Sequence, residues 1–160
     1  MTIEIPLTQG QMALIDDEDF ELVNQHNWHA AWNEHGKTFY AMTNTVRRDG
    51  TITTEYMHRL ILGAKRGQHV DHIHHLTLDN RRSEIRLCNN AQNAHNSGPK
   101  FNNTSGYKGV CWHKHTKKWR ARIRVSGKRI FLGYYLTPEA AHSAYCEAAH
   151  RLHGEFARTT

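Results

Sequence analysis

The sequence contains no long apolar run, and this absence sets the first limits on its function. Its mean hydropathy is -0.75. Runs such as Leu60-Ile61-Leu62 are far shorter than the roughly 20 apolar residues that a membrane-spanning helix needs. The first ten residues, MTIEIPLTQG, lack the basic and apolar segments of a secretory signal. We therefore predict a soluble protein of the cytoplasm.

Cysteine is also scarce. Cys88, Cys111 and Cys146 are odd in number, and none belongs to a C-x-x-C pair. They therefore predict neither a disulfide framework nor a thiolate zinc site. Because a free cysteine behaves as a small hydrophobe, we expect buried free thiols. With 38% hydrophobic residues in 160, the chain predicts no large core and is long enough for one domain or two small ones.

Positive charge is present in excess, and it is unevenly distributed. Residues 1–100 hold 10 Lys and Arg against 12 Asp and Glu, a balance of −2. Residues 101–160 hold 11 Lys and Arg against three Glu, a balance of +8. Such asymmetry indicates a polyanionic partner for the C-terminal part, although a solvated basic surface is an open alternative on charge alone.

Residues 107–135 carry the alternating pattern of β-strands. Within 118–125, side chains of two kinds fall on opposite faces of one strand: Lys118, Arg120, Arg122 and Arg124 against Trp119, Ala121, Ile123 and Val125. Ser126-Gly127 suits a tight turn. The next strand is predicted to place Ile130, Leu132 and Tyr134 on the apolar face, opposite Arg129 and Phe131. With 107–113 as a third strand, the pattern predicts an antiparallel sheet with one apolar and one basic face.

A helix that can cover the apolar face follows. Thr137 is a good N-cap, Pro138 suits the first helical position, and Gly154 is a natural stop. Apolar residues recur between them at helical spacing, namely Ala141, Ala144, Tyr145, Ala148 and Leu152. With one face covered, the arginine face stays open. A basic antiparallel sheet of this size can enter the major groove of DNA, where arginine contacts guanine and phosphate.

The segments GYKGVCWH, KWRARIRVSGKRIFLGYY and TPEAAHSAYCEAAHRLHGEFA resemble the APETALA2-type DNA-binding domain, from residue 105 to about residue 158. The resemblance implies a three-stranded sheet, backed by one helix, that lies in the major groove of double-stranded DNA. The positions that match its DNA-contacting face are Lys108, Arg122, Arg124, Arg129 and Phe131, and the strand pattern adds Arg120. Cys111 and His113 stand where plant members usually carry arginine, so the base preference does not carry over.

Residues 69–80, HVDHIHHLTLDN, concentrate four histidines and two aspartates. Around them, residues 56–96 predict a strand that ends at Asp71-His72, a polar loop LTLDNRRS, a strand EIRLC and a helix NNAQNAHN. Surface histidines beside a hairpin are one interpretation. A zinc site made of His69, His72, His74 and His75 is a second, which is disfavoured because a strand alternates its faces. A nuclease centre is the third.

The nuclease interpretation has a chemical basis. Hydrolysis of a phosphodiester requires an activated water, a neutralised phosphate charge and a stabilised leaving oxygen. Imidazole, with an unperturbed pKa of about 6.5, is largely neutral at cellular pH and can take a proton from water. Carboxylate and amide oxygens suit Mg²⁺, which binds through few protein ligands and keeps positions for water and phosphate.

The segments MHRLILG and VDHIHHLTLDNRRSEIRLCNNAQNAHN are similar to the HNH endonucleases of the phage and intron homing type. The resemblance implies Asp71 and Asn93 as ligands of Mg²⁺ or Mn²⁺, and His72 as general base. Glu84 replaces the middle asparagine of the family motif, which normally pins the loop. Asn80 is the candidate to replace it, whereas Glu84 either approaches the metal or weakens the enzyme.

We therefore predict an α+β protein with a β-rich N-terminal module (1–56), a ββα-metal HNH nuclease core (57–96), a linker (97–106) and the DNA-binding domain (107–160). In the N-terminal module, ALIDDEDFELV is predicted to be helical, and Trp28 and Trp32 to lie in a small core. The predicted function is metal-dependent hydrolysis of phosphodiester bonds in duplex DNA, in a bacterial or phage-infected cell, without a protein partner. The alternatives are a DNA-binding protein with an impaired nuclease centre, a zinc-stabilised domain and an RNA-cutting toxin.

Overall fold

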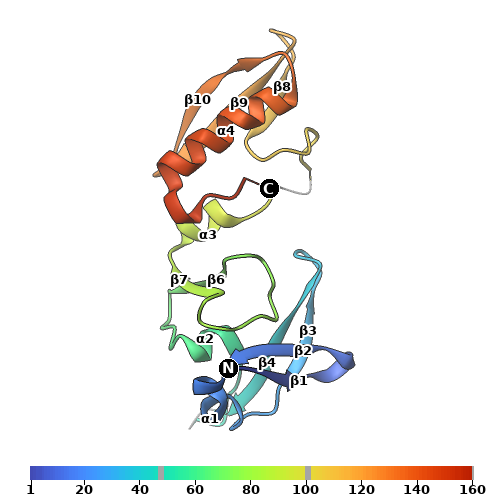
Figure 1. Cartoon of the computed structure of the whole chain (residues 1–160), viewed down its shortest axis with the longest axis vertical. Helices are drawn as coiled ribbons and strands as arrows, with labels where there is room; N and C mark the ends of the chain where they lie inside the picture. Colours follow the sequence, from blue (N-terminus) through green and yellow to red (C-terminus); the bar gives the residue numbers. More distant parts are fainter. Residues whose placement is uncertain (47–48, 100–101, 160) are drawn as a thin grey trace. The chain divides into compact units, whose positions relative to one another are not determined.

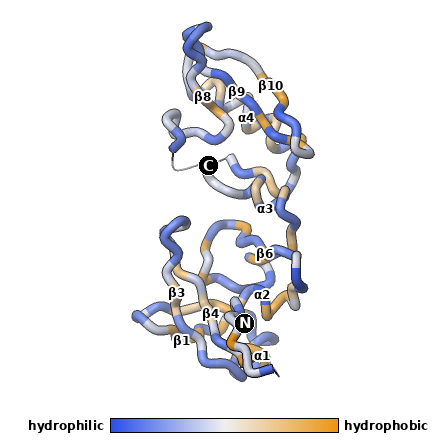
Figure 2. Tube along the Cα trace, turned by 180° about the vertical axis from the view of Figure 1, so that it is seen from behind, coloured by the Kyte–Doolittle hydropathy of each residue, from blue (hydrophilic) through white to orange (hydrophobic). Residues whose placement is uncertain are grey.

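The chain folds into two compact units, Met1–Asn89 and Asn90–Thr160, and each is described by itself (Figure 1). The computed structural model describes residues 1–46, 49–99 and 102–159. Two positions of the predicted linker, 100 and 101, lie outside these ranges. Hydrophobic segments are short in both units (Figure 2), and none of the described helices has the length and apolar character needed to cross a bilayer.

The first unit contains three small antiparallel sheets. β1 (Thr2–Pro6) pairs with β2 (Met12–Asp16), and β4 (Thr38–Val46) lies between β3 (His29–Asn33) and β5 (Ile52–Tyr56). The third sheet is a two-stranded hairpin, β6 (His69–His72) with β7 (Ile85–Cys88). Two short helices complete the unit, α1 (Phe20–Val23) and α2 (Met57–Ile61). The predicted β-rich character of residues 1–56 is therefore present.

One core joins these sheets. It contains buried side chains from each part of the unit, including Ile15, Val23, Trp28, Met57 and Ile85. Two details of the sequence prediction are wrong here. Trp32 is 47% exposed, since its ring packs on Phe39 at the surface. ALIDDEDFELV is helical from Asp17 onward, as a 3-10 turn (Asp17–Asp19) followed by α1, but its first four residues belong to β2 and pair with β1.

The second unit consists of α3 (Asn90–Asn96), a three-stranded antiparallel sheet and α4 (Pro138–His153). The sheet order is β10 (Lys128–Tyr135), β9 (Lys118–Val125), β8 (Val110–His113). α4 covers one face of this sheet (Figure 1), where its Ala141, Tyr145 and Ala148 pack on Val110, Ala121 and Ile123. The Oγ1 atom of Thr137 accepts a hydrogen bond from the backbone N–H of Ala140 at 3.2 Å. The predicted sheet, cap and helix are all present.

An irregularity in β10 changes which residues face α4. The pairing with β9 shifts between Phe131 and Gly133, so Tyr134 lies opposite Arg120 and Tyr135 lies opposite Trp119. Such a bulge adds one residue to a strand and inverts the alternation beyond it. The prediction that Tyr134 lies on the apolar face is therefore wrong. Tyr135 packs against the helix-covered core in its place.

Candidate functional site

The loop between β6 and β7 is held by contacts with distant parts of the first unit. The backbone N–H of Leu14 donates to the Leu78 carbonyl at 2.8 Å, and the N–H of Asn80 donates back to the Leu14 carbonyl at 2.7 Å. The hydroxyl of Thr77 donates to the Phe39 carbonyl at 2.6 Å. The LTLDNRRS segment is thus fixed against β2 and β4, which gives the N-terminal module a structural role.

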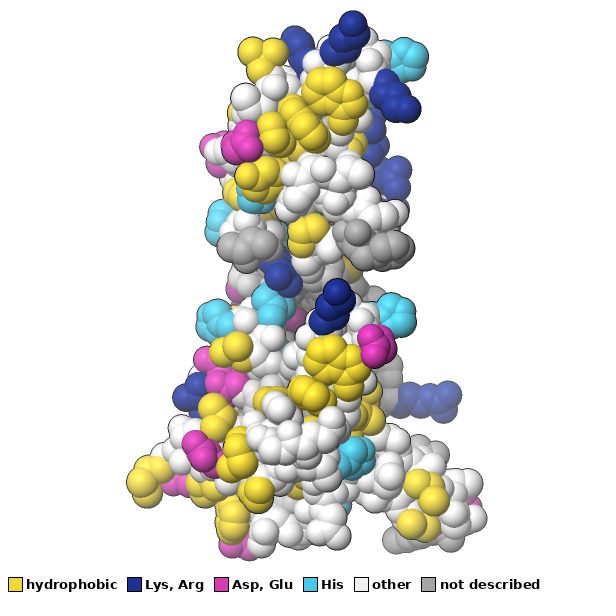
Figure 3. All heavy atoms as spheres, turned by 90° about the vertical axis from the view of Figure 1, so that its right-hand side faces the viewer, with side chains coloured by type: hydrophobic (Ala, Val, Ile, Leu, Met, Phe, Trp, Pro, Cys, Tyr) yellow, Lys and Arg dark blue, Asp and Glu magenta, His cyan; other side chains and the backbone are white. Residues whose placement is uncertain are grey.

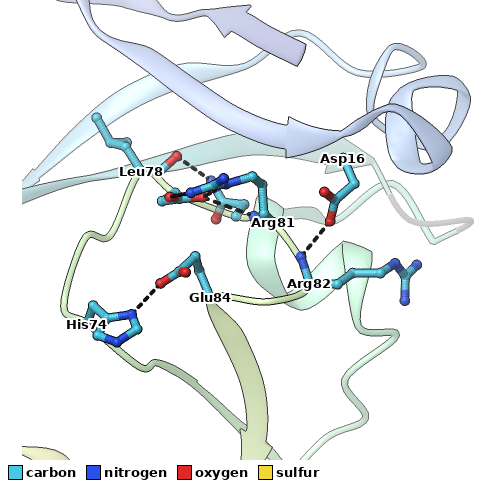
Figure 4. Close-up of polar contacts among 8 residues, drawn as sticks. Asp16, His74, Leu78, Arg81, Arg82 and Glu84 are labelled. Carbon is cyan, nitrogen blue, oxygen red and sulfur yellow. Dashed lines mark hydrogen bonds and ion pairs between the residues drawn. The ribbon is translucent and has the colours of Figure 1, made fainter. Parts of the chain in front are cut away.

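The charged residues of the loop bind one another and also bind the N-terminal module (Figure 4). Arg81 binds both carboxylate oxygens of Asp79, at 2.8 and 2.5 Å, and this pairing holds the pKa of Asp79 below its ordinary value. The backbone N–H of Arg82 donates to Asp16 at 2.8 Å, and its guanidinium binds Asp19 at 2.7 Å. A loop fixed in this way can hold side chains in a defined geometry.

Asn80 is the residue through which the loop reaches the predicted general base. Its side chain is fully buried, and its Nδ2 donates to the Leu78 carbonyl at 3.0 Å. Its Oδ1 lies 3.4 Å from Nε2 of His72. If that contact fixes the proton on Nε2, Nδ1 is the nitrogen that carries the lone pair of the neutral ring. Asn80 therefore both pins the loop and orients His72.

His72 lies at the end of β6, where it is buried among aromatic and polar side chains. Burial lowers its pKa, and the neighbouring Asn80 and the Asp71 carboxylate oppose this effect. Its ring contacts that of His58, with centroids 4.8 Å apart, and that of Tyr40, at 6.0 Å. His58 is itself buried, and burial lowers its pKa to about 3. Both imidazoles are thus biased toward the neutral form.

Asp71 precedes His72 and is 6% exposed. Its Oδ2 accepts hydrogen bonds from Nε of Arg86 at 3.1 Å and from a terminal nitrogen of Arg86 at 3.0 Å. Arg86 is the register partner of Asp71 across the hairpin. A carboxylate is a hard oxygen donor that suits Mg²⁺, and a cation at this position would share the carboxylate with a guanidinium.

The other predicted site residues lie elsewhere. Glu84 binds Nδ1 of His74 through its Oε2 at 2.6 Å (Figure 4). Asn93 lies on α3, in the second unit, so the first unit by itself brings together Asp71, His72 and Asn80. Within 1–46, 49–99 and 102–159, no group of three or more His, Cys, Asp or Glu side chains is arranged to hold a metal ion.

The second unit has an open sheet face that is rich in guanidinium groups. Arg124 and Arg129 lie opposite each other and are exposed, and Phe131 lies opposite Arg122. Arg120 and Arg122 approach the Cys111 sulfur at 3.4 and 3.7 Å. Several Lys and Arg side chains line one side of this unit, at the upper right of Figure 3.

An aromatic cluster borders the arginines. The ring of Tyr134 lies 4.9 Å from that of Phe131 and 5.0 Å from that of His113, between centroids. Sequence alternation missed Tyr134 as a member of this face, although Gly133, with a φ of 139°, marks the bulge that places it there. The face therefore offers both cations and exposed apolar rings to a ligand.

Lys108 was expected on the same face, and its ammonium is bound to the end of α3. Its Nζ donates to the backbone carbonyls at the end of α3, those of Ala94, His95 and Ser97. The other predicted DNA-contacting residues, Arg120, Arg122, Arg124, Arg129 and Phe131, are brought together by β9 and β10.

Comparison with known proteins agrees with this architecture. A family model described as the AP2 domain matches residues 105–155. Protein 3.8 of Escherichia phage T7 is 31% identical over 93 residues, which are 58% of this chain and 76% of that protein. The chain belongs to the family of phage T7 protein 3.8. It also carries a DNA-binding domain of the AP2 type, whose sheet and helix are β8–β10 and α4. No solved structure matches the chain.

Proposed function

We propose that the protein is a metal-dependent DNA endonuclease of the HNH type, and that the AP2 domain binds it to double-stranded DNA. The observation that carries the proposal is the buried His72, with Nε2 beside Asn80 and the Asp71 carboxylate next to it in the chain. A neutral imidazole oriented through one nitrogen is what a general base requires. The expected place of action is the cytoplasm of a bacterial or phage-infected cell.

In this mechanism, His72 takes a proton from a water molecule whose oxygen attacks the phosphorus of the scissile phosphodiester. The bond to the 3′ oxygen breaks, and that oxygen leaves with the bonding electron pair. Asn80 keeps the His72 ring in position during the transfer. Asp71 would hold the divalent cation, with Asn93 as the second ligand implied by the family resemblance. Bound there, Mg²⁺ or Mn²⁺ would supply Lewis-acid stabilisation of the charge on the phosphate and the leaving oxygen.

The test is incubation of the purified protein with a randomised duplex library and Mg²⁺ or Mn²⁺, followed by sequencing of cut ends. His72→Ala should reduce cleavage by about 10²–10⁴-fold, the range for loss of a general base, with DNA affinity nearly unchanged. Wild-type protein that binds duplex DNA and never cuts it with either cation would refute the enzymatic part.

A second candidate function is DNA binding without cleavage. The Arg86–Asp71 ion pair favours it, since a guanidinium already occupies Oδ2 of the carboxylate that would bind the cation. Titration with Mn²⁺ separates the two functions. If the wild-type protein binds Mn²⁺ and Asp71→Asn does not, the result supports the endonuclease. If the wild-type protein binds no Mn²⁺ even with DNA bound, the result supports the second candidate.

A further inference from the structure

Lys108 has an unusual environment for a residue that sequence reasoning assigns to DNA. Its Nζ donates to the carbonyl of Ala94 at 3.3 Å, to that of Ser97 at 2.6 Å and to that of His95. An ammonium group has three protons, and these three carbonyls accept all of them. Burial, and secondarily Arg158, lowers the pKa of Lys108 to about 8, so the group stays charged at neutral pH.

The carbonyls that Lys108 binds are at the C-terminal end of α3. The last carbonyls of a helix have no partner within it, and a cation there also interacts favourably with the helix dipole. The backbone N–H of Ser97 donates to the Asn93 carbonyl at 3.0 Å, which continues the last turn. Lys108 therefore caps the turn to which Asn93 belongs.

α3 has further attachments to the same unit. The rings of His95 and His153 stack with centroids 3.6 Å apart and an interplanar angle of 5°. Gly98 lies against Arg158, so that an added Cβ would meet its guanidinium at 3.3 Å. A helix of seven residues is too short to be stable by itself in water. Its conformation depends on these attachments, and Lys108 supplies three hydrogen bonds from a charged group.

We propose that Lys108 is a positioning residue that fixes α3, and with it Asn93, to the DNA-binding sheet, and that it does not contact DNA. As far as cleavage is concerned, the proposal rests on the proposed function, in which Asn93 is a metal ligand. The AP2 domain then has two tasks. Its arginines bind the duplex, and its half-buried Lys108 keeps α3, which carries Asn93, in a fixed relation to those arginines.

The experiment compares Lys108→Met with Arg129→Met in the full-length protein, because each removes one positive charge. Affinity for one duplex oligonucleotide, selected by the wild type from a randomised library, is measured without divalent cation at several salt concentrations. A lost phosphate contact lowers the slope of log affinity against log salt by about one. We expect that decrease for Arg129→Met, and for Lys108→Met an unchanged slope with affinity within about threefold of the wild type.

Hydrogen exchange of residues 90–99 tests whether Lys108 fixes α3, and this test does not depend on cleavage. Lys108→Met should accelerate exchange of these amides by about tenfold or more, because the helix end opens locally, and Arg129→Met should not. His153→Ala, which removes the stacked ring, should also accelerate exchange of these amides, and Lys108→Gln, which removes the charge, decides the question if Lys108→Met does not fold. With Mg²⁺, Lys108→Met should lower kcat for cleavage by about 10- to 100-fold, the cost of a small misplacement, and leave KM within about threefold.

Three results would overturn the proposal: a salt slope that falls by about one in Lys108→Met, exchange of residues 90–99 that stays at the wild-type rate, or a raised KM with kcat intact. Absence of cleavage in the wild-type protein would refute the proposed endonuclease alone. In that case the salt slope and the exchange rates still decide whether Lys108 fixes α3 or contacts DNA.

Discussion

The two units use arginine in opposite ways. In the first unit, Arg81, Arg82 and Arg86 bind the carboxylates of Asp79, Asp19 and Asp71, and they hold a loop in place. In the second unit, Arg124 and Arg129 have no ion pair with any described carboxylate. Its three glutamates lie on α4 and directly after it, away from the open face. An arginine beside a carboxylate builds structure, whereas one left without a carboxylate is available for phosphate.

The sharpest test of the independence of the two units is Gly109→Ala. A Cβ at this position would lie 2.2 Å from the Tyr145 ring and 2.7 Å from the Arg122 carbonyl, in a backbone with a φ of +76°. We expect a loss of about 3 kcal/mol or more from strain and overpacking, confined to the second unit. Gly127→Ala is the control, because its φ is +78° and nothing lies within 4 Å of the added Cβ. It should cost about 1 kcal/mol.

Both variants are measured by hydrogen exchange, resolved by segment. If Gly109→Ala and Gly127→Ala lose the same amount of stability in the second unit, the contact with Tyr145 is not the cause of the loss. Faster exchange in β1–β7 of Gly109→Ala would contradict the division into two units.

The role of the open face is tested by Arg124→Met against Arg151→Met. Arg124 lies on the open face, and Arg151 is an exposed residue of α4, which covers the other face. Arg124→Met should weaken duplex binding by about tenfold, or about 1.4 kcal/mol, and lower the salt slope by about one. Arg151→Met should change neither quantity. Equal effects of the two substitutions would mean that net charge, and not the open face, determines affinity.

The first unit should lose stability as the pH falls, because it buries His58. Because burial lowers its pKa to about 3, the native state resists protonation, whereas the unfolded chain binds a proton near its ordinary value of 6.5. The contribution to stability is complete above 6.5 and is lost as the pH falls from there toward 3. Between pH 7.5 and pH 5, wild-type protein should lose about 2 kcal/mol more than His58→Phe in urea unfolding. Equal losses would show that His58 is protonated in the native state.

The smallest effect is expected at Glu84. Since Asn80 pins the loop and Glu84 binds the exposed His74, Glu84→Asn should change stability by less than about 1 kcal/mol and leave cleavage within about twofold. Asn80→Ala is the contrasting variant, with an expected loss of about 1–3 kcal/mol from unsatisfied buried groups. A tenfold rise of cleavage in Glu84→Asn would show instead that Glu84 impairs the centre.

The features that sequence reasoning anticipated are mainly local. Thr137 and Pro138 begin α4 because capping depends on adjacent residues, and the hairpin around Asp71-His72 follows from two short apolar runs with a polar loop between them. The features that it missed depend on contacts between distant residues. The bulge that turns Tyr134 outward is a property of the pairing between β9 and β10. The hydrogen bonds of Lys108 depend on where α3 packs.

The hydrogen bonds between Leu14 and the loop residues Leu78 and Asn80 have a consequence for the minimal form of the molecule. A shortened chain that begins at Met57 would retain every residue of the proposed nuclease centre. It would lose the strand against which the loop folds, and with it the order of the loop that carries Asn80. The smallest functional fragment therefore has to include the first hairpin, although that hairpin contributes no reactive group.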